Sequence, residues 1–257
     1  MAVTALLISA PASHADEART LDEVTACVER SIPRPDGIRA VRIVARDRAG
    51  SERVTVARVY SRRADDGLQQ LLLRVVRPEE LRGTSFLILE RPGENEIYFK
   101  STELPDVKRI RTTGRSARMF GSDFSYEDFE YWQAVAAPGE SKRLGDATIG
   151  ERPVYVVETR VAKADDSAYE KVVTFVDKKT CIPLRMEFYE PGDRLRKELI
   201  VNPHQILQRG STWVAHMAVI RDIREFTTTQ FLVDSTEQEG GLPAAMFSVE
   251  GLKREER

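Results

Sequence analysis

Hydrophobic and polar residues alternate along most of the chain in a succession of short runs. The clearest runs cover residues 38–47, 52–63, 68–78, 84–100, 142–163, 169–201, 211–222 and 227–236. Alternation with a period of two is typical of β-strands, because successive side chains point to opposite faces of a sheet. Turn residues such as Gly, Asp and Pro separate the runs. Long strands joined by short turns predict an antiparallel meander of about a dozen strands.

Helical spacing replaces this alternation near each end of the chain. Leu21, Val24 and Val28 fall on one face of a helix predicted over residues 16–30. The segment "SIPRPDG" ends that helix with two prolines and a turn. A second, short helix opened by Pro243 is predicted near the C-terminus.

The faces of the strands indicate how the sheet is covered. Leu184, Met186 and Phe188 point to one face of their strand. Residues 71–76 and 86–89 are apolar on both faces, so something apolar must cover both sides there. Either a curved sheet wraps around an apolar interior with helices as a plug, or two sheets pack as a full β-sandwich. The pattern leaves both arrangements open.

Composition excludes several classes of protein. The 257 residues are 41% hydrophobic and 31% charged, with a formal net charge of -2. This composition is that of a globular protein and not of a disordered one. Because the chain has no excess of positive charge, we expect no nucleic acid as a partner.

The first residues resemble a short signal peptide. An apolar run over residues 2–10 precedes Ser13 and Ala15, which are small residues at the -3 and -1 positions of a cut before Asp16. The segment lacks a Lys or Arg before its apolar run, and the alternative is a frayed N-terminal helix. We therefore expect a signal peptide over residues 1–15 and a single domain over 16–257. No segment is long enough to make the chain an integral membrane protein.

Residues for catalysis or metal binding are scarce. The three histidines have no His, Cys or Asp partner at the spacing of a metal site, and the nucleophile-elbow, P-loop and dinucleotide-binding motifs are absent from the sequence. We expect no cofactor and no metal. Cys27 and Cys181 could form a disulfide in an exported protein, which we predict, or remain two buried free thiols.

The segment "RMFGSDFSYEDFEYW", residues 118–132, combines acidic and aromatic side chains. Asp123, Glu127 and Asp128 could bind a divalent ion or act as an acid–base pair. However, Ser125 and Asp128 have the spacing of a helix capping box, and five basic residues lie between 108 and 118 and could pair with the carboxylates. The pattern favours a structural role for this acidic cluster.

This segment also resembles the hallmark of the LolA-like family of periplasmic, outer-membrane lipoprotein-sorting proteins. The similarity lies in "FGSDFSYEDFEYW", and residues 71–91, 97–116 and 181–197 resemble further segments of that family. Together the similar segments lie between residues 36 and 243. The matching signature residues are Gly121, Ser122, Asp123, Phe124, Tyr126, Glu127 and Asp128.

The resemblance implies a mainly β fold, in which a strongly curved antiparallel sheet of about 11–13 strands forms an unclosed β-barrel, with helices plugging or covering the opening. It also implies a carrier that is not an enzyme. The partners would be the acyl chains of a lipoprotein or lipid, and an inner-membrane transporter of the resistance-nodulation-division (RND) type. Such a carrier needs an apolar cavity, because each methylene exposed to water costs about 0.8 kcal/mol.

Apolar residues on facing strands are the candidates for the wall of an acyl cavity, although each could equally belong to an ordinary core. These candidates are Leu71, Leu73, Phe86, Ile88, Phe175, Leu184, Met186, Phe188 and Met217. The sequence therefore predicts a periplasmic carrier that binds acyl chains for transfer between components of the envelope. One alternative is a non-catalytic adaptor of a transporter complex that uses the surface near residues 108–132. The other is a metal-dependent hydrolase built on Asp123, Glu127 and Asp128.

Overall fold

The computed structural model describes residues 19–31, 37–92, 95–104, 106–111, 114–133, 139–162, 167–209, 212–237 and 241–254. Within this part of the chain, thirteen strands form one antiparallel sheet and two more form a separate hairpin. The strands are β1 (Gly37–Arg46), β2 (Glu52–Arg63), β3 (Gln69–Arg77), β4 (Ser85–Leu89), β5 (Glu96–Lys100), β6 (Lys108–Ile110), β7 (Gly139–Ile149), β8 (Arg152–Val161), β9 (Lys171–Asp177), β10 (Pro183–Glu190), β11 (Arg194–Val201), β12 (Ile206–Arg209), β13 (Thr212–Ala215), β14 (Met217–Asp222) and β15 (Thr227–Glu237). The helices are α1 (Leu21–Ser31), α2 (Tyr126–Gln133) and α3 (Val249–Lys253), with short 3-10 helices η1 (Glu79–Leu81), η3 (Pro203–Gln205) and η4 (Ala244–Met246).

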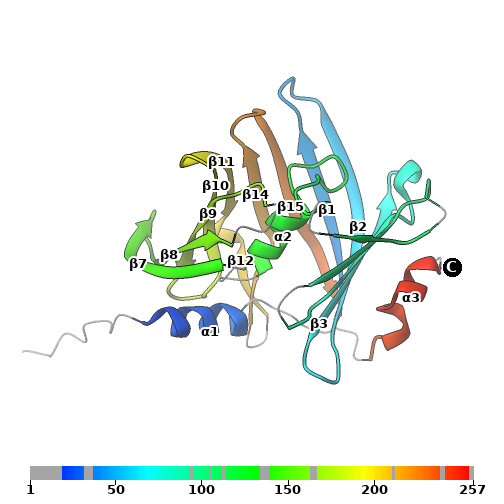
Figure 1. Ribbon diagram of the computed structural model, residues 1–257, viewed down its shortest axis with the longest axis horizontal. Coiled ribbons are helices and arrows are strands. Elements are labelled where there is room, and N and C mark those ends of the chain that lie inside the picture. Colours follow the sequence, from blue (N-terminus) through cyan, green and yellow to red (C-terminus); the bar gives the residue numbers. More distant parts are fainter. Residues whose placement is uncertain are drawn as a thin grey trace, which may run out of the picture.

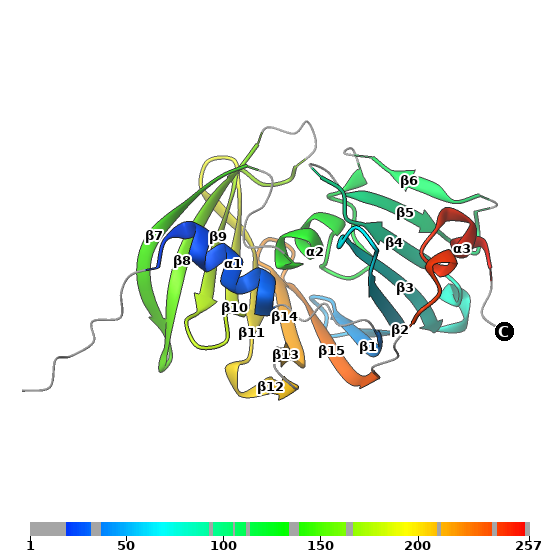
Figure 2. The same ribbon diagram turned by 90° about the horizontal axis from the view of Figure 1, so that it is seen from below.

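The sheet is continuous but does not close into a barrel. Its strand order is β6-β5-β4-β3-β2-β1-β15-β14-β11-β10-β9-β8-β7, and β6 and β7 form its two edges. The N-terminal and C-terminal strands meet in the middle, where Ile43 of β1 lies opposite Phe231 of β15. The sheet bends strongly, and α2 lies inside the bend (Figure 1, Figure 2). The predicted unclosed, curved barrel is confirmed, and the sandwich alternative is wrong because all thirteen strands share one sheet.

Both faces of the sheet are covered, as the doubly apolar strands require. Leu73 of β3 belongs to the core on the concave face, which also contains Phe129 of α2, whereas its neighbour Leu72 packs with Leu252 of α3 on the convex face. In the other half of the sheet, Val24 of α1 packs against a second convex cluster. Among the α-helices of the described residues, α1 and α3 therefore cover the outside of the bend, and α2 fills its inside.

The predicted strand over residues 211–222 is interrupted. His216 separates β13, which pairs with β12, from β14, which pairs with β11 and β15. The backbone N–H of His216 donates to Gln205, and its carbonyl accepts from the N–H of Val233. His216 therefore serves as the junction between the hairpin and the main sheet, and its Nδ1 lies 3.1 Å from the carbonyl oxygen of Val233.

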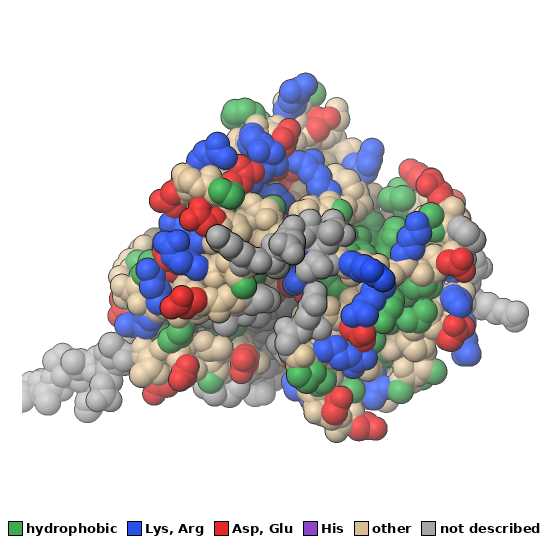
Figure 3. Space-filling view, in the orientation of Figure 1, with side chains coloured by type: hydrophobic (Ala, Val, Ile, Leu, Met, Phe, Trp, Pro, Cys, Tyr) green, Lys and Arg blue, Asp and Glu red, His purple; other side chains and the backbone are tan. Residues whose placement is uncertain are grey.

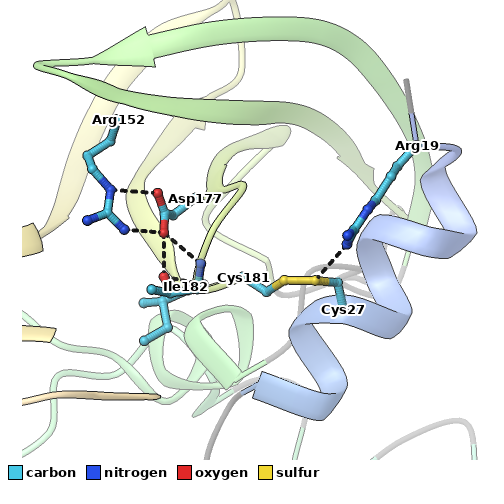
Figure 4. Close-up of a disulfide and its surroundings, with 7 residues drawn as sticks. Arg19, Cys27, Arg152, Asp177, Cys181 and Ile182 are labelled. Carbon is cyan, nitrogen blue, oxygen red and sulfur yellow. Dashed lines mark hydrogen bonds and ion pairs between the residues drawn. A yellow bond between two sulfur atoms is a disulfide. The ribbon is translucent and has the colours of Figure 1, made fainter. Parts of the chain in front are cut away.

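A disulfide joins α1 to the turn between β9 and β10. The bond links Cys27 to Cys181, whose Cα atoms are 5.7 Å apart (Figure 4). Beside it, the buried carboxylate of Asp177 accepts from Arg152 Nε at 2.9 Å and from the backbone N–H of Thr180 at 2.8 Å. Burial by itself would raise the pKa of the Asp177 carboxyl. The hydrogen bonds from Arg152 and Thr180 have the larger effect and hold this pKa below its ordinary value.

Candidate functional site

The signature segment begins α2 with the predicted capping box. The backbone N–H of Ser125 donates to Asp128 Oδ2 at 2.8 Å, and the N–H of Asp128 donates to Ser125 Oγ at 3.1 Å. These reciprocal bonds satisfy amide groups that the first helical turn would otherwise leave without a partner. The box fixes the start of α2 inside the concave face of the sheet.

Asp123 ties the loop before α2 to β15. Its Oδ2 accepts from the hydroxyl of Thr229 at 2.8 Å, and its Oδ1 accepts from the hydroxyl of Thr227. Its backbone N–H donates to Thr229 Oγ1 at 2.9 Å. Only 2% of Asp123 is exposed. The carboxylate is therefore hydrogen-bonded within the fold, although Asp123 also lines a pocket of about 250 Å³ together with Arg53 and Arg118.

Asp128 ties the first turn of α2 to β11. Lys197 Nζ lies 2.7 Å from Asp128 Oδ2, and the hydroxyl of Tyr169 donates to Oδ1 at 2.6 Å. Lys197 Nζ also donates to the backbone carbonyl of Asp123 at 2.8 Å. One buried ammonium group thus holds both ends of the loop that precedes the helix.

Glu127 contacts the segment before β9. Its carboxylate accepts from the hydroxyls of Ser167 and Tyr131 and, at 3.2 Å, from the backbone N–H of Ala168. Burial raises the pKa of Glu127; the bonds from Ser167 and Ala168 oppose this, and the negative charge of Asp128 adds to it.

The basic residues upstream pair only in part as expected. Arg115 bonds to Glu130, and Arg118 Nη2 lies 3.1 Å from Asp222 and 3.8 Å from Asp123. The expectation that this basic block neutralises the acidic cluster is wrong for Asp128, whose cation comes from β11. Sequence reasoning could not identify Lys197 as the partner of Asp128, because the two residues are far apart in the sequence. The neighbours of Lys197, Arg196 and Glu198, are also charged, so nothing in the local pattern singles it out.

The remaining signature residues shape the loop and the helix. Gly121 has a φ of +67°, a backbone conformation that favours glycine. The hydroxyl of Ser122 accepts from the N–H of Phe124. The ring of Phe124 stacks on Trp132, and the ring of Tyr126 packs on Phe86 at 5.0 Å. In the described residues, no group of three or more His, Cys, Asp or Glu side chains is placed to hold a metal ion.

An apolar cavity lies between α2 and the concave face of the sheet. Its volume is about 90 Å³. The wall is formed by α2, by the strands β1, β2, β3, β13 and β15, and by the end of the turn between β9 and β10 with the first residue of β10. The lining residues are Arg39, Val41, Val59, Leu71, Phe129, Trp132, Ile182, Pro183, Val214, Ala215, Phe231 and Val233. Trp132 and Phe231 pack edge to face at 5.4 Å across it. The hydrophobic end of α2 therefore forms one wall, while its polar first turn anchors the helix.

Of the nine cavity candidates, one is among the residues that line this space. Leu71 lines the cavity. Five candidates are fully buried in the hydrophobic core: Leu73, Phe86, Leu184, Met186 and Phe188. Ile88 and Phe175 are half-buried and pack against that core. Met217 is half-buried on β14. Contact of these residues with an acyl chain stays a prediction.

The sequence analysis did not single out most of the cavity wall. Val41, Val59, Phe231 and Val233 come from strands whose pairing joins the two ends of the chain, and this pairing is not visible in local patterns. Trp132 lies in the signature segment, and its position at the end of an amphipathic helix was the one available signal. On the face shown in Figure 3, charges of both signs are interleaved, and hydrophobic side chains gather on the half built from β2 to β6.

Comparisons with known proteins agree with this architecture. An outer-membrane lipoprotein-sorting protein domain from Vibrio parahaemolyticus has 23% identity, covers 91% of this chain and 98% of its own, and gives a TM-score of 0.79. A DUF1329 family protein from Desulfovibrio piger has 21% identity, coverage of 90% and 97%, and a TM-score of 0.81. A LolA superfamily protein from Nitrosomonas europaea has 16% identity, coverage of 90% and 98%, and a TM-score of 0.70.

Comparisons of the sequence identify the family to which this chain belongs. No curated protein matches this chain in sequence. Among the described residues, no helix is both long and apolar enough to span a bilayer. A family model described as an uncharacterized protein matches residues 67–254. The chain belongs to that family, and its fold is the LolA-like fold of outer-membrane lipoprotein-sorting proteins.

Proposed function

We propose that this protein is a periplasmic carrier that shelters acyl chains of a lipoprotein or lipid between α2 and the concave face of the sheet. The observation that carries the proposal is the apolar cavity whose wall includes Phe129 and Trp132 of α2 and Phe231 of β15. Transfer of an acyl chain through water requires such a surface, because burial of each methylene contributes about 0.8 kcal/mol. The disulfide between Cys27 and Cys181 is compatible with an oxidising compartment such as the periplasm.

The volume of the cavity sets a condition on this function. About 90 Å³ is less than the ~150 Å³ of an engineered protein cavity that accepts one benzene ring. The closed form therefore has room for only a short piece of an acyl chain. Loading requires α2 to move away from the sheet, which would have to break the ion pair of Glu130 with Arg115 near its C-terminal end or the buried contacts of its first turn.

A cavity-filling substitution tests the proposal. Val233 of β15 is half-buried and lines the cavity, so Val233→Trp places a large ring in the space. We expect the affinity for a fluorescent fatty-acid probe to fall by about tenfold or more, which is ~1.4 kcal/mol. Val54→Trp makes the same change at an exposed position of β2 and should leave the affinity unchanged. Equal affinity of wild type and folded Val233→Trp would contradict acyl binding in this cavity.

The small closed volume also favours a second candidate, a non-catalytic adaptor of an envelope transporter of the RND type. Its contact surface would be the segment from Lys108 to Trp132, in which Arg109 and Arg118 remain largely exposed. The two functions differ in lipid content. Mass spectrometry of protein taken from its native envelope should find co-purifying acyl lipids for a carrier and none for an adaptor.

A further inference from the structure

One charged side chain lies in the wall of the acyl cavity. Among the described residues that line this space, Arg39 of β1 is the only one with a charge, and it is half-buried. Val41 lies on the same face of β1, and Val59 of β2 is the direct cross-strand partner of Arg39. Both valines also line the cavity. The guanidinium group therefore adjoins a surface that is otherwise apolar.

The hydrogen bonds of Arg39 are incomplete. Its Nη2 donates to the hydroxyl of Ser61 at 3.2 Å, and this partner carries no charge. Its Nε is buried and has no acceptor. A buried N–H group without an acceptor is unfavourable, and a water molecule in an apolar wall finds few of the further polar partners that it needs. The Nε atom therefore marks a place for an acceptor that the fold itself does not supply.

Arg42 shows how a guanidinium group on the same strand is satisfied. It lies three residues after Arg39 and points to the opposite face of β1. Its Nε and Nη2 donate to the two carboxylate oxygens of Asp234 at 2.6 and 2.8 Å. This paired geometry is the one by which arginine binds carboxylates and phosphates. On Arg39 the same two atoms are Nη2, which has a second N–H besides the one given to Ser61, and Nε, which has no acceptor.

We propose that Arg39 binds the anionic head of the acyl ligand, so that the carrier selects lipids whose polar end is a carboxylate or a phosphate. The inference rests on the proposed carrier function, because it concerns the same cavity. Burial lowers the pKa of Arg39 below its ordinary value, and an anion in contact with the guanidinium group opposes this shift. An acyl chain in ester or amide linkage offers only a neutral carbonyl oxygen and gains less from this contact.

The position of Arg39 on the sheet fits this role. Arg39 and Ser61 lie on β1 and β2, two neighbouring strands in the interior of the continuous sheet, and neither belongs to α2. Loading requires α2 to move, because the closed cavity is small. The anchor for the head does not move with the helix. The head of the ligand can therefore stay on Arg39 while α2 opens and closes over the acyl chain.

Three ligands with the same chain and different ends test the proposal. Decanoate carries a carboxylate, decyl phosphate carries a phosphate, and decanol carries a neutral hydroxyl. Binding to the wild type is measured by titration calorimetry at fixed ionic strength. We expect at least one of the two anions to bind about tenfold or more tightly than decanol, because hydrogen bonds to charged groups are the stronger ones. Preference for decanoate identifies a fatty acid as the ligand class, and preference for decyl phosphate identifies a phosphate headgroup.

Substitution of Arg39 assigns the preference to this residue. Arg39→Met removes the charge and keeps a long side chain, so the affinity for the preferred anion should fall by about tenfold or more while the affinity for decanol stays within about twofold. Arg39→Lys keeps the charge without the fork and should lose less. Arg42→Met is the matched control, because it removes the same charge from an exposed ion pair on the other face of β1. It should leave all three affinities unchanged.

The outcomes separate the head site from the carrier function. Equal affinity of the wild type for the anions and for decanol overturns the head site and leaves the carrier function standing, and this comparison needs no variant. An equal loss for all three ligands in folded Arg39→Met also overturns it, because the residue then only shapes the cavity. If the wild type binds none of the three ligands, the carrier function itself is contradicted, and the head site with it.

Discussion

Lys197 of β11 and Asp128 of α2 form a buried ion pair, with 2.7 Å between Nζ and Oδ2. We expect Lys197→Met to lower the free energy of unfolding by about 3–5 kcal/mol, because removal of one partner leaves a buried charge without its counterion. Urea denaturation followed by circular dichroism measures this difference.

The double variant Lys197→Met/Asp128→Leu separates the pair from the cost of an isolated charge. Replacement of both members by apolar side chains should recover part of the lost stability. Asp128 also caps α2 and accepts from Tyr169, so the recovery should be incomplete. A double variant as unstable as the sum of the single variants would show that the two side chains do not act as a pair.

Trp132 restricts the acyl cavity, so its removal should enlarge the space. We expect Trp132→Ala to bind a short-chain fluorescent fatty acid several-fold more tightly, because the lost ring leaves an apolar space that the probe can fill. The stability of the empty protein should fall by up to about 3–5 kcal/mol. Binding is measured by fluorescence titration.

Trp213→Ala is the matched control for this substitution. Trp213 is also half-buried, but it lies on β13 outside the cavity wall, and Lys179 Nζ packs over its ring. The control should lose stability without a gain in probe affinity. Equal gains in both variants would mean that the probe binds a loosened surface and not the cavity.

Glu127 predicts a pH dependence of stability. Because burial raises the pKa of this carboxyl in the fold, the folded state binds more protons than the unfolded state above the unfolded pKa of about 4.3. Stability from this group is therefore greatest at low pH and falls as the pH rises through the folded pKa. Glu127→Gln should remove this dependence.

The measurement is the difference in unfolding free energy between Glu127→Gln and the wild type at several pH values between about 4.5 and 7.5. We expect the difference to shift in favour of the variant as the pH rises. Carboxyls that do not interact with Glu127, such as Asp177, contribute equally in the two proteins, so their contributions cancel. A constant difference would mean that Glu127 has the same pKa in the folded and unfolded protein.

Much of the fold could be predicted from local patterns, because alternation identifies strands and the "SYED" spacing identifies the start of α2. The run over residues 52–63 is one strand as expected, and the run over 169–201 contains the strands β9, β10 and β11. The pairing of Ile43 with Phe231 was not predictable, because register between distant strands depends on the whole sheet. The partners of the acidic cluster could not be predicted for the same reason. Lys197 and Thr229 contact Asp128 and Asp123 from strands that are distant from the cluster in the sequence.

The disulfide gives the last prediction. Thiol titration of unreduced, denatured protein should find no free cysteine, because Cys27 and Cys181 are joined. Cys27→Ala/Cys181→Ala should lower the free energy of unfolding by about 2–5 kcal/mol, since the bond closes a long loop. Val24 and Val28 still pack on the sheet in that variant, so α1 should remain helical but exchange its amide hydrogens faster. Two titratable thiols in the unreduced wild type would contradict the bond, and unchanged exchange in α1 would show that apolar packing alone holds the helix.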